Sequence, residues 1–389
     1  MYLYFLGSNH QLSLAELESL LGYRNVSFFD ESSGIVESNS KLNLKRLGGV
    51  IKIAEVITKL NIEANLEDEL PRLISKLNPN QRNKLNLGIS VYGKKMPPPA
   101  ISKLAFSIKH AMKQNLSLRI IPNKNQDLGS AQLAHLKLGS GGLELNLIFK
   151  KSNVYVASTL ESQNLKNYTL RDYGRPARDA RVGMLPPKLA QIMLNLSVKD
   201  EKSGTVLDPF CGTGVLLQEA ALAGFDFIGS DIEPRMVEMT LTNLEFINYK
   251  FKLELSPQQL KDRVLVADAT SGKWANPNFV VSEVFLGRPL TKLPAGENLK
   301  EIIEDVNTIT KKFLLNLKSQ IKNEARICLA VPAWRNGNRF IDLPLIDQLE
   351  VLGYNRLSLK LVTDSDLLYF RKDSIVARRI LLLKLKENY

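Results

Sequence analysis

The 389-residue sequence predicts an α/β protein in which a doubly wound, mostly parallel sheet follows smaller α+β units. From Pro186 onward, short apolar segments of strand type alternate with segments of helical periodicity, which is typical of a parallel sheet covered by helices. The chain is also longer than one hydrophobic core usually organises. We therefore expect several domains.

Changes in pattern divide the chain into four segments. Residues 1–60 combine YLYFL, LSLAELESLL and SGIVES, which predict strand, helix and strand in a small α+β unit. Residues 61–160 predict a second α+β unit from helices such as AISKLAFSIKHAMKQN and strands such as LNLGISVYG and LELNLIFKK. Residues 161–185 contain helix-breaking Gly and Pro and predict a linker. Residues 186–389 contain the sheet.

The elements of residues 186–389 follow in a regular order. A helix begins with proline at PPKLAQIMLNLS, and it precedes strand VLDPF, helix VLLQEAALAG and strand DFIGSDI. Helix EPRMVEMTLTNLEFI leads to strands VLVADAT and NFVVSEV, followed by a long helix from ENLKEIIEDV and strand ARICLAVP. LLYFRKD and SIVARRILLLKLK predict an antiparallel hairpin at the C-terminus.

Composition limits the class of protein. Hydrophobic residues make up 44% and charged residues 24% of the chain, which indicates packed cores. The two cysteines, Cys211 and Cys328, and three histidines form no CxxC or HxxxH pattern, so we expect neither a disulfide framework nor a metal. The first residues lack the basic and long apolar regions of a signal or membrane helix. We expect a cytoplasmic protein.

The positive charge is concentrated in one part of the chain. Residues 81–188 hold 18 Lys or Arg against 5 Asp or Glu, and this excess accounts for the net charge of +12. A basic block joined to a balanced remainder favours a module that binds a polyanion. A solvated basic surface that only aids solubility explains the charge equally well.

The stretch VLDPFCGTG, residues 206–214, predicts a ligand-binding turn at the carboxyl edge of the sheet. Gly212 and Gly214 allow close approach of backbone N–H groups at a helix N-terminus. Asp208 suits a ligand ammonium, Asp231 ends the next strand and suits ribose hydroxyls, and Asp268 follows the third strand and suits an adenine amine. S-adenosylmethionine (SAM) carries all three groups. Singly, each residue is explained as well by a helix cap or an ordinary turn.

LDPFCGTG with GSDI and ADAT resembles the SAM-dependent methyltransferases of exocyclic amines. RPARDARVGMLPPKLAQIM resembles the segment before that motif in the tRNA guanosine-N2 methyltransferases acting on position ten. The resemblance runs along essentially the whole chain. It implies a ferredoxin-like domain over 1–60, an RNA-binding THUMP domain over 61–160 and a Rossmann-like methyltransferase domain over 186–389.

The same resemblance assigns site residues. Around the motif, it implies that the methionine part, the ribose and the adenine of SAM are held by Met184, Pro186, Asp208, Pro209, Phe210, Cys211, Gly212, Thr213, Gly214, Asp231, Ile232, Asp268 and Ala269. The THUMP-like block and linker would bind tRNA phosphates through Lys94, Lys95, Lys109, Lys113, Arg119, Lys124, Arg175 and Arg178.

The catalytic turn departs from the family pattern. Family members place D/N-P-P-Y after the fourth strand, where the acid and a carbonyl hold the amine and the aromatic ring stacks on the base. This chain has SEVFLG instead. An ungapped match puts Glu283 at the acid and Gly287 at the glycine; a shifted match puts Ser282 first and Phe285 at the aromatic position. We expect Glu283 to orient the amine and Phe285 to stack on the base. The alternative is that Glu283 is a surface acid at the strand end and that Phe285 packs in the core.

Three functions stay open on the sequence. The first is a tRNA guanine-N2 methyltransferase, which the basic block beside a SAM motif favours. The second is a DNA amino-methyltransferase, and the third is a catalytically weak protein that binds RNA and SAM, as the altered turn would allow. Some relatives need a small activating protein partner, and the sequence leaves that need undecided.

Overall fold

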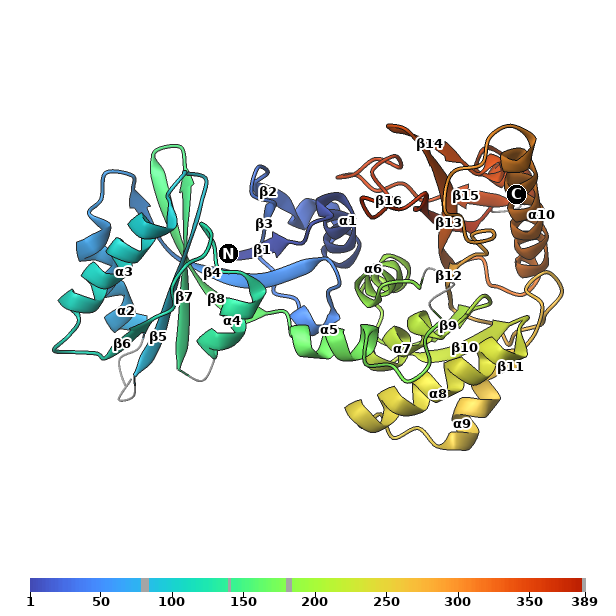
Figure 1. The fold of residues 1–389 in the computed structure, drawn as a ribbon, viewed down its shortest axis with the longest axis horizontal. Coiled ribbons are helices and arrows are strands. Elements are labelled where there is room, and N and C mark those ends of the chain that lie inside the picture. The colour runs from blue at the N-terminus through green and yellow to red at the C-terminus, as the bar shows by residue number, and fades with distance from the viewer. Residues whose placement is uncertain (78–83, 139–140, 180–183, 387–389) are drawn as a thin grey trace. The chain divides into compact units, whose positions relative to one another are not determined.

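The computed structural model describes residues 1–77, 84–138, 141–179 and 184–386, and its contacts divide the chain into two compact units. The first unit contains residues 1–10, 24–45 and 50–166, and the second contains residues 11–23, 46–49 and 167–389. Each unit is built around its own β-sheet (Figure 1).

The first unit contains an eight-stranded sheet of order β2-β3-β1-β4-β8-β7-β5-β6. Its strands are β1 (Tyr2–Leu6), β2 (Ser27–Asp30), β3 (Ile35–Ser38), β4 (Val50–Asn61), β5 (Leu85–Tyr92), β6 (Leu118–Ile120), β7 (Gly142–Lys150) and β8 (Asn153–Ser162). Its helices are α2 (Leu66–Leu77), α3 (Pro98–Ala111) and α4 (Ser130–Leu136). The expected boundary at residue 60 falls inside β4, which pairs with both β1 and β8, so one sheet crosses it.

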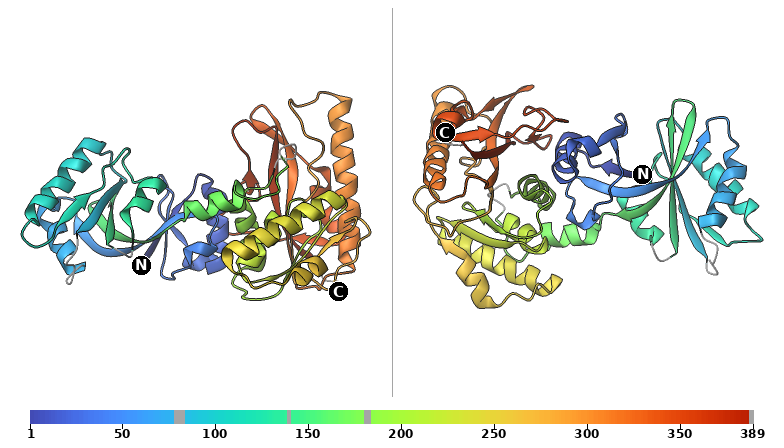
Figure 2. Two further views of the ribbon diagram at one scale, coloured as in Figure 1. Left: turned by 60° about the horizontal axis from the view of Figure 1, so that its bottom comes forward. Right: turned by 180° about the vertical axis from the view of Figure 1, so that it is seen from behind.

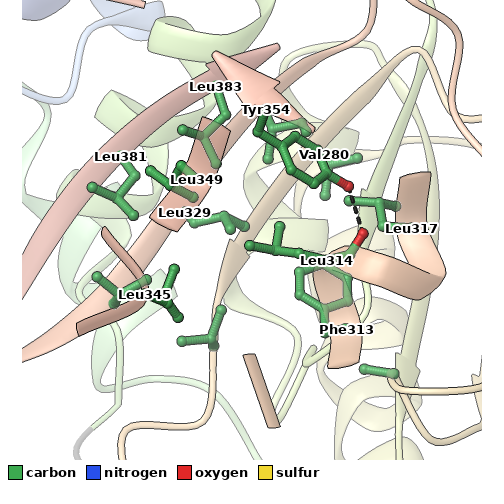
Figure 3. Close-up of a cluster of buried hydrophobic side chains, with 14 of the residues drawn as sticks. Val280, Phe313, Leu314, Leu317, Leu329, Leu345, Leu349, Tyr354, Leu381 and Leu383 are labelled. Carbon is green, nitrogen blue, oxygen red and sulfur yellow. Dashed lines mark hydrogen bonds between the residues drawn. The ribbon is translucent and has the colours of Figure 1, made fainter. Parts of the chain in front are cut away.

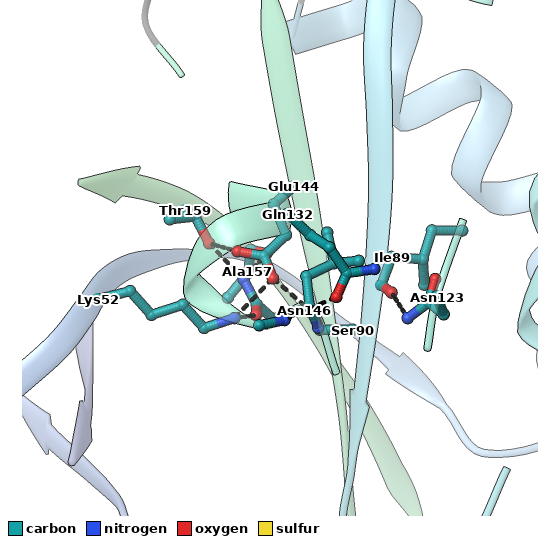
Figure 4. A network of polar contacts seen from close by, with 11 residues as sticks. Lys52, Ile89, Ser90, Asn123, Gln132, Glu144, Asn146, Ala157 and Thr159 are labelled. Atoms are coloured by element: carbon teal, nitrogen blue, oxygen red, sulfur yellow. Dashed lines mark hydrogen bonds and ion pairs between the residues drawn. The ribbon is translucent and has the colours of Figure 1, made fainter. Parts of the chain in front are cut away.

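A buried polar network lies inside this sheet (Figure 4). Lys52 is 1% exposed and donates to Glu144 Oε1 at 2.6 Å and to Asn146 Oδ1 at 2.7 Å. Ser90 and Thr159 also donate to the Glu144 carboxylate. Because a buried charge is tolerated when it is paired and hydrogen-bonded, these contacts explain why charged residues occupy strand positions that face a core.

The second unit contains a sheet of order β11-β10-β9-β12-β13-β17-β15, with β14 paired to β13 and β16 paired to β17. Its strands are β9 (Thr205–Asp208), β10 (Asp226–Asp231), β11 (Val264–Val266), β12 (Phe279–Glu283), β13 (Arg326–Asn336), β14 (Arg339–Asp342), β15 (Tyr354–Arg356), β16 (Leu368–Tyr369) and β17 (Val376–Leu385). Strands β9 to β13 pair in parallel, and β17 runs antiparallel to β13. This arrangement confirms the predicted α/β fold with an antiparallel C-terminal part.

Helices cover both faces of the second sheet. The helices that lie wholly or mostly in this unit are α1 (His10–Leu21), α5 (Leu165–Asp172), α6 (Pro187–Val198), α7 (Val215–Leu222), α8 (Pro234–Phe251), α9 (Pro257–Arg263), α10 (Glu297–Lys318) and α11 (Leu349–Leu352). Figures 1 and 2 show α6 and α10 on opposite sides of this sheet. Among the helices of the described ranges, none is long and apolar enough to cross a membrane.

The core beneath α10 fixes the strands that carry the site (Figure 3). Val280 of β12, Leu329 of β13 and Leu381 of β17 pack with Phe313 and related side chains of α10. The hydroxyl of Tyr354 donates to the carbonyl of Leu314 at 2.6 Å, so the one polar group of that ring is satisfied within the core. The carboxyl ends of β9 and β12 are therefore held on a rigid base.

Candidate active site

The glycine-rich turn lies at the carboxyl end of β9, between that strand and α7. Gly212 and Gly214 have φ of +52° and +80°, which residues with a Cβ rarely adopt. A Cβ on Gly214 would lie 2.8 Å from a methyl carbon of Thr240, so glycine is required there for space as well. A Cβ on Gly212 would meet no atom within 4 Å, so this side of the turn is open.

Two polar side chains of α8 support the turn from behind. Thr240 donates to the Gly212 carbonyl at 2.7 Å, and Asn243 donates to the Thr213 carbonyl at 2.9 Å. Cys211 is 5% exposed, and burial raises the pKa of its thiol well above the ordinary value. The turn is thus braced from α8 through its carbonyls, while the Gly212 N–H donates to Asp231 and the Gly214 N–H to the Cys211 carbonyl. The sequence motif gave no signal for these two supports.

Asp208 ends β9 as a buried carboxyl group, 2% exposed. Its Oδ1 accepts a hydrogen bond from Ser282 Oγ at 2.6 Å and one from the Phe210 N–H at 3.3 Å. Burial raises the pKa of Asp208 to about 7, with the Ser282 and Phe210 hydrogen bonds acting against this. A cationic ligand group would favour its charged form.

The acids that follow the next two strands lie at the same sheet edge. Asp231 accepts from the Gly212 N–H at 2.9 Å and from the Glu233 N–H at 3.0 Å, one on each carboxylate oxygen. Asp268 follows β11 and accepts from the Thr270 N–H at 2.8 Å. Ile232, next to Asp231, is an apolar side chain with 62% of its surface exposed.

These features fit SAM. Asp231 is already fixed by two backbone donors, and each of its oxygens retains an accepting lone pair for a ribose hydroxyl. Exposed Ile232 offers apolar surface beside it, and the open side of Gly212 leaves room for a ligand against the turn. The other residues predicted around the turn occupy the same edge: Pro209 and Thr213 are buried, and Phe210 packs edge-on against Phe313.

Further predicted pocket residues flank this edge. Met184 and Pro186 are partly exposed and lie directly before α6, and Ala269 is buried next to Asp268. The Met184 sulfur accepts a contact from Arg175 Nη2 at 3.6 Å. Their contacts with a cofactor stay predictions, since the geometry gives only their positions.

The predicted catalytic residues fall in three different environments. Glu283 ends β12 and forms an ion pair with Arg378 of β17, whose Nη2 lies 3.4 Å from Glu283 Oε2. Burial raises the pKa of Glu283, and the Arg378 charge counteracts that rise. Phe285 is 44% exposed beyond the strand end. Gly287 has φ of +89° and turns the chain after it.

Ser282 has a different place from the one expected. It is fully buried, and its hydroxyl is used by Asp208, so it positions that carboxyl group and does not face a substrate. Side chains alternate across a strand, which sends Ser282 and Glu283 to opposite faces of β12. Arg378 was missed by the sequence reasoning because it lies 95 residues from Glu283, with no motif to connect them.

The predicted RNA contacts also divide by exposure. Lys94, Lys95, Lys109, Lys113, Arg119 and Lys124 are all exposed and belong to the part of the first unit formed by β5, α3, β6 and their loops. Arg178 is exposed as well, with its guanidinium 5.1 Å from the Tyr173 ring centroid. The predicted phosphate contact of Arg175 does not fit this structure, because its side chain is 0% exposed; burial also lowers its pKa. It packs beside Asp172 and Met184 and cannot reach a phosphate here.

Among the residues that the structure describes, no group of three or more His, Cys, Asp or Glu could hold a metal ion. The titratable groups of the site are carboxyl groups, a thiol and an arginine. Such a set suits hydrogen bonding and charge stabilisation of an organic cation and an amine.

Strand order, glycine turn and acidic strand ends together define a class of protein. Residues 175–352 match the family of RMKL-like methyltransferase domains. This part of the chain is therefore similar to a methyltransferase domain, which agrees with the SAM-type features of the sheet edge.

Particular relatives can be named. The chain is 35% identical over 120 residues to a tRNA (guanine(10)-N2)-dimethyltransferase of Methanocaldococcus jannaschii, covering 30% of this chain and 32% of that protein. It is 31% identical over 161 residues to the enzyme of the same name from Methanothermobacter thermautotrophicus, covering 41% and 42%. The chain thus spans less than half the length of these curated relatives.

The fold of the whole chain also has a solved counterpart. The crystal structure of TrmN from Thermus thermophilus aligns with a TM-score of 0.50 and 13% identity, covering 99% of both chains. At that identity the likeness concerns the fold alone.

Proposed function

We propose that this protein is a SAM-dependent tRNA methyltransferase that modifies the exocyclic N2 amine of a guanosine, at position ten. The observation that supports this most directly is the pairing of a SAM-type edge with Glu283 and exposed Phe285 at the end of the neighbouring strand β12. Relatives that match part of this chain bear the name tRNA (guanine(10)-N2)-dimethyltransferase.

The residues of this chain would serve the transfer mainly by orientation. SAM supplies an activated methyl group when bound. The guanine amine is a weak nucleophile because its lone pair is delocalised into the ring. The Glu283 carboxylate, paired with Arg378, would accept a hydrogen bond from the amine and hold its lone pair in line. Phe285 would stack on the extruded base.

The ion pair compensates for the altered turn. In family members, two prolines restrict the backbone conformation directly after the acid, whereas this chain has Val284 and Phe285 at those positions. Val284 is buried, and its N–H donates to the Ala330 carbonyl at 3.1 Å, which fixes the backbone directly after Glu283. Arg378 fixes the end of the longer side chain. Together they would restore a defined position for the carboxylate.

The test is transfer of labelled methyl groups from SAM to unmodified tRNA, with the product located by nucleoside mass spectrometry. Glu283→Gln should lower the rate of N2-methylguanosine formation by about a hundredfold, because loss of an orienting contact has effects of that order. SAM affinity should stay unchanged. Glu304→Gln, an exposed acid of α10, is the matched control.

Each other outcome contradicts a defined part of the proposal. A methylated nucleoside other than N2-methylguanosine would overturn the guanine assignment. Equal rates in wild type and Glu283→Gln would remove Glu283 from the mechanism. Binding of SAM and tRNA without transfer would overturn the enzymatic function, provided that adding a cell extract, as a source of an activating protein, does not restore transfer.

A further inference from the structure

A patch of aromatic and cationic side chains lies beyond the candidate active site on the second unit. We name it the aromatic–basic platform, and it consists of Arg335, Arg339, Phe340, Phe370, Arg371 and Lys372. The rings of Phe340 and Phe370 lie 5.2 Å apart between centroids and are tilted by 50°. The Arg335 guanidinium lies 5.8 Å from the Phe370 centroid.

The fold builds this platform from the strand ends around β13. Strand β13 turns at Gly337, with φ of +62°, and returns as β14, which places Phe340 directly opposite Arg335. The loop between β16 and β17 carries Phe370 and Lys372 to the same place (Figure 1 labels β13, β14 and β16). Arg335 Nη1 donates to the Lys372 carbonyl at 2.5 Å, which ties the loop to β13. Strand pairing and this hydrogen bond therefore hold the platform residues next to one another.

The platform shares the carboxyl edge of the sheet with Glu283. Glu283 lies opposite Ala330 of β13, and Arg335 follows five residues further along that strand. At about 3.3 Å per strand residue, the platform begins roughly 16 Å beyond Glu283. Arg378, the partner of Glu283, also pairs with Tyr369 of β16, the neighbour of Phe370. A few nucleotides would span this distance.

Charge and exposure indicate the chemistry of the occupant. Phe370 is 45% exposed, and Arg339, Arg371 and Lys372 are exposed cations. Nearby Asp342 is already paired with Arg379, at 3.1 Å. Exposed aromatic rings set among cations are typical of surfaces that bind unpaired nucleic acid, because the bases stack on rings and the phosphates are neutralised.

We propose that the aromatic–basic platform binds unpaired RNA nucleotides that flank the reacting base, with Phe370 as the stacking ring. This inference rests on the proposed function, and it gives the methyltransferase unit an RNA contact of its own, separate from the basic surface of the first unit. A target amine can reach Glu283 only when its base leaves the stack, and neighbouring nucleotides would then be available to the platform.

The experiment measures binding of full-length protein to fluorescent unmodified tRNA and to a single-stranded oligouridine, together with methyl transfer. Phe370→Ala should weaken oligouridine binding by between about fivefold and a hundredfold, the range for loss of one stacked base. The double variant Arg339→Glu and Arg371→Glu should weaken it in a salt-dependent way. SAM affinity should remain that of wild type and so report an intact fold.

Matched variants carry the same changes elsewhere on the unit. Tyr249→Ala removes an aromatic ring that is 79% exposed on α8, and Lys261→Glu with Lys312→Glu reverses two exposed cations. These should bind RNA as wild type does. Losses equal to those of the platform variants would overturn the proposal, as would unchanged RNA binding in Phe370→Ala and the double variant.

Failure of the proposed function gives a different result. If wild type transfers no methyl group to tRNA but loses oligouridine binding through Phe370→Ala, the platform is supported and the tRNA methyltransferase proposal is contradicted. If transfer proceeds normally in every platform variant and RNA binding is unchanged, the enzyme is supported and the platform is contradicted.

Discussion

At the scale of single residues, the site depends on carboxyl groups whose neighbours set their charge. Asp208 is buried with a pKa near 7, whereas Glu283, also buried, faces the guanidinium of Arg378. The difference lies in the partner: a hydroxyl for Asp208 and a cation for Glu283. The first acid can therefore respond to a bound cation, while the Arg378 charge counteracts the rise that burial causes in the pKa of the second.

We predict that SAM binding weakens as the pH falls below about 7. The raised pKa means that Asp208 becomes neutral below that value, and a neutral carboxyl group attracts the methionine ammonium less strongly. Calorimetric titration at pH 6, 7 and 8 should show the highest affinity at pH 8. Asp208→Asn should bind SAM weakly and lose this dependence, whereas Asp305→Asn should keep it. A wild-type affinity that does not change with pH would contradict the assignment of Asp208.

At the scale of elements, helix α1 packs in a different unit from the segments that flank it in the sequence. Residues 11–23 belong to the second unit, although the segments on both sides of them pack in the first. Buried Glu16 accepts from the N–H groups of Gly48 at 2.9 Å and Gly49 at 2.8 Å, and from Asn195 Nδ2 of α6 at 2.7 Å. One carboxyl group thus joins α1, a short loop and α6.

We expect Glu16→Ala to lower the free energy of unfolding of the second unit by at least about 2 kcal/mol, because it leaves buried donors without an acceptor. Chemical denaturation followed with and without SAM would measure the change, and Glu31→Ala, an exposed acid, is the control. An unchanged denaturation midpoint would show that the Glu16 carboxyl group contributes nothing to the stability of this unit.

The same residue predicts a pH effect on stability. Burial raises the pKa of Glu16 to about 7, so the folded state favours the protonated form more than the unfolded chain does. The contribution of Glu16 protonation to folding stability is present in full below pH 4.5 and is lost as the pH rises through about 7. Between pH 5 and 8, the free energy of unfolding measured by denaturation should fall less with rising pH in Glu16→Gln than in wild type. An identical decline in both would contradict the role of Glu16.

At the scale of the whole molecule, charge and chemistry reside in different units. The exposed lysines predicted to bind RNA lie on the first unit, and the SAM edge lies on the second. Since the first sheet is continuous across residue 60, the parts predicted over 1–60 and 61–160 share one sheet. RNA affinity and SAM affinity should therefore respond to different substitutions.

We predict that reversing two charges, Lys94→Glu with Lys95→Glu, weakens tRNA binding and leaves SAM binding unchanged. Loss of two phosphate contacts should make the plot of log affinity against log salt shallower, by about one unit of slope per contact. Binding titrations at several salt concentrations measure this slope. An affinity loss that is the same at every salt concentration would point to misfolding and against a phosphate-binding role.

Much of the methyltransferase edge could be predicted because its signals are local in sequence. The turn from Asp208 to Gly214 and the acids Asp231 and Asp268 each follow a strand, and parallel strands bring such ends together. The burial of Ser282 and Arg175 was not predicted, because burial depends on packing that composition does not reveal. Ser282 donates to Asp208 of another strand, whereas Arg175 is buried beside its near neighbours Asp172 and Met184.

The sequence by itself determined the α/β class, the glycine turn and the order of the acidic strand ends, because backbone conformation and strand periodicity are encoded within a few residues. The tertiary structure alone decided that Arg378 holds Glu283, that α1 packs in the second unit, and that Phe340 and Phe370 meet beside Arg335. These are contacts between segments far apart along the chain, and only the register of strands and the burial of charge select them.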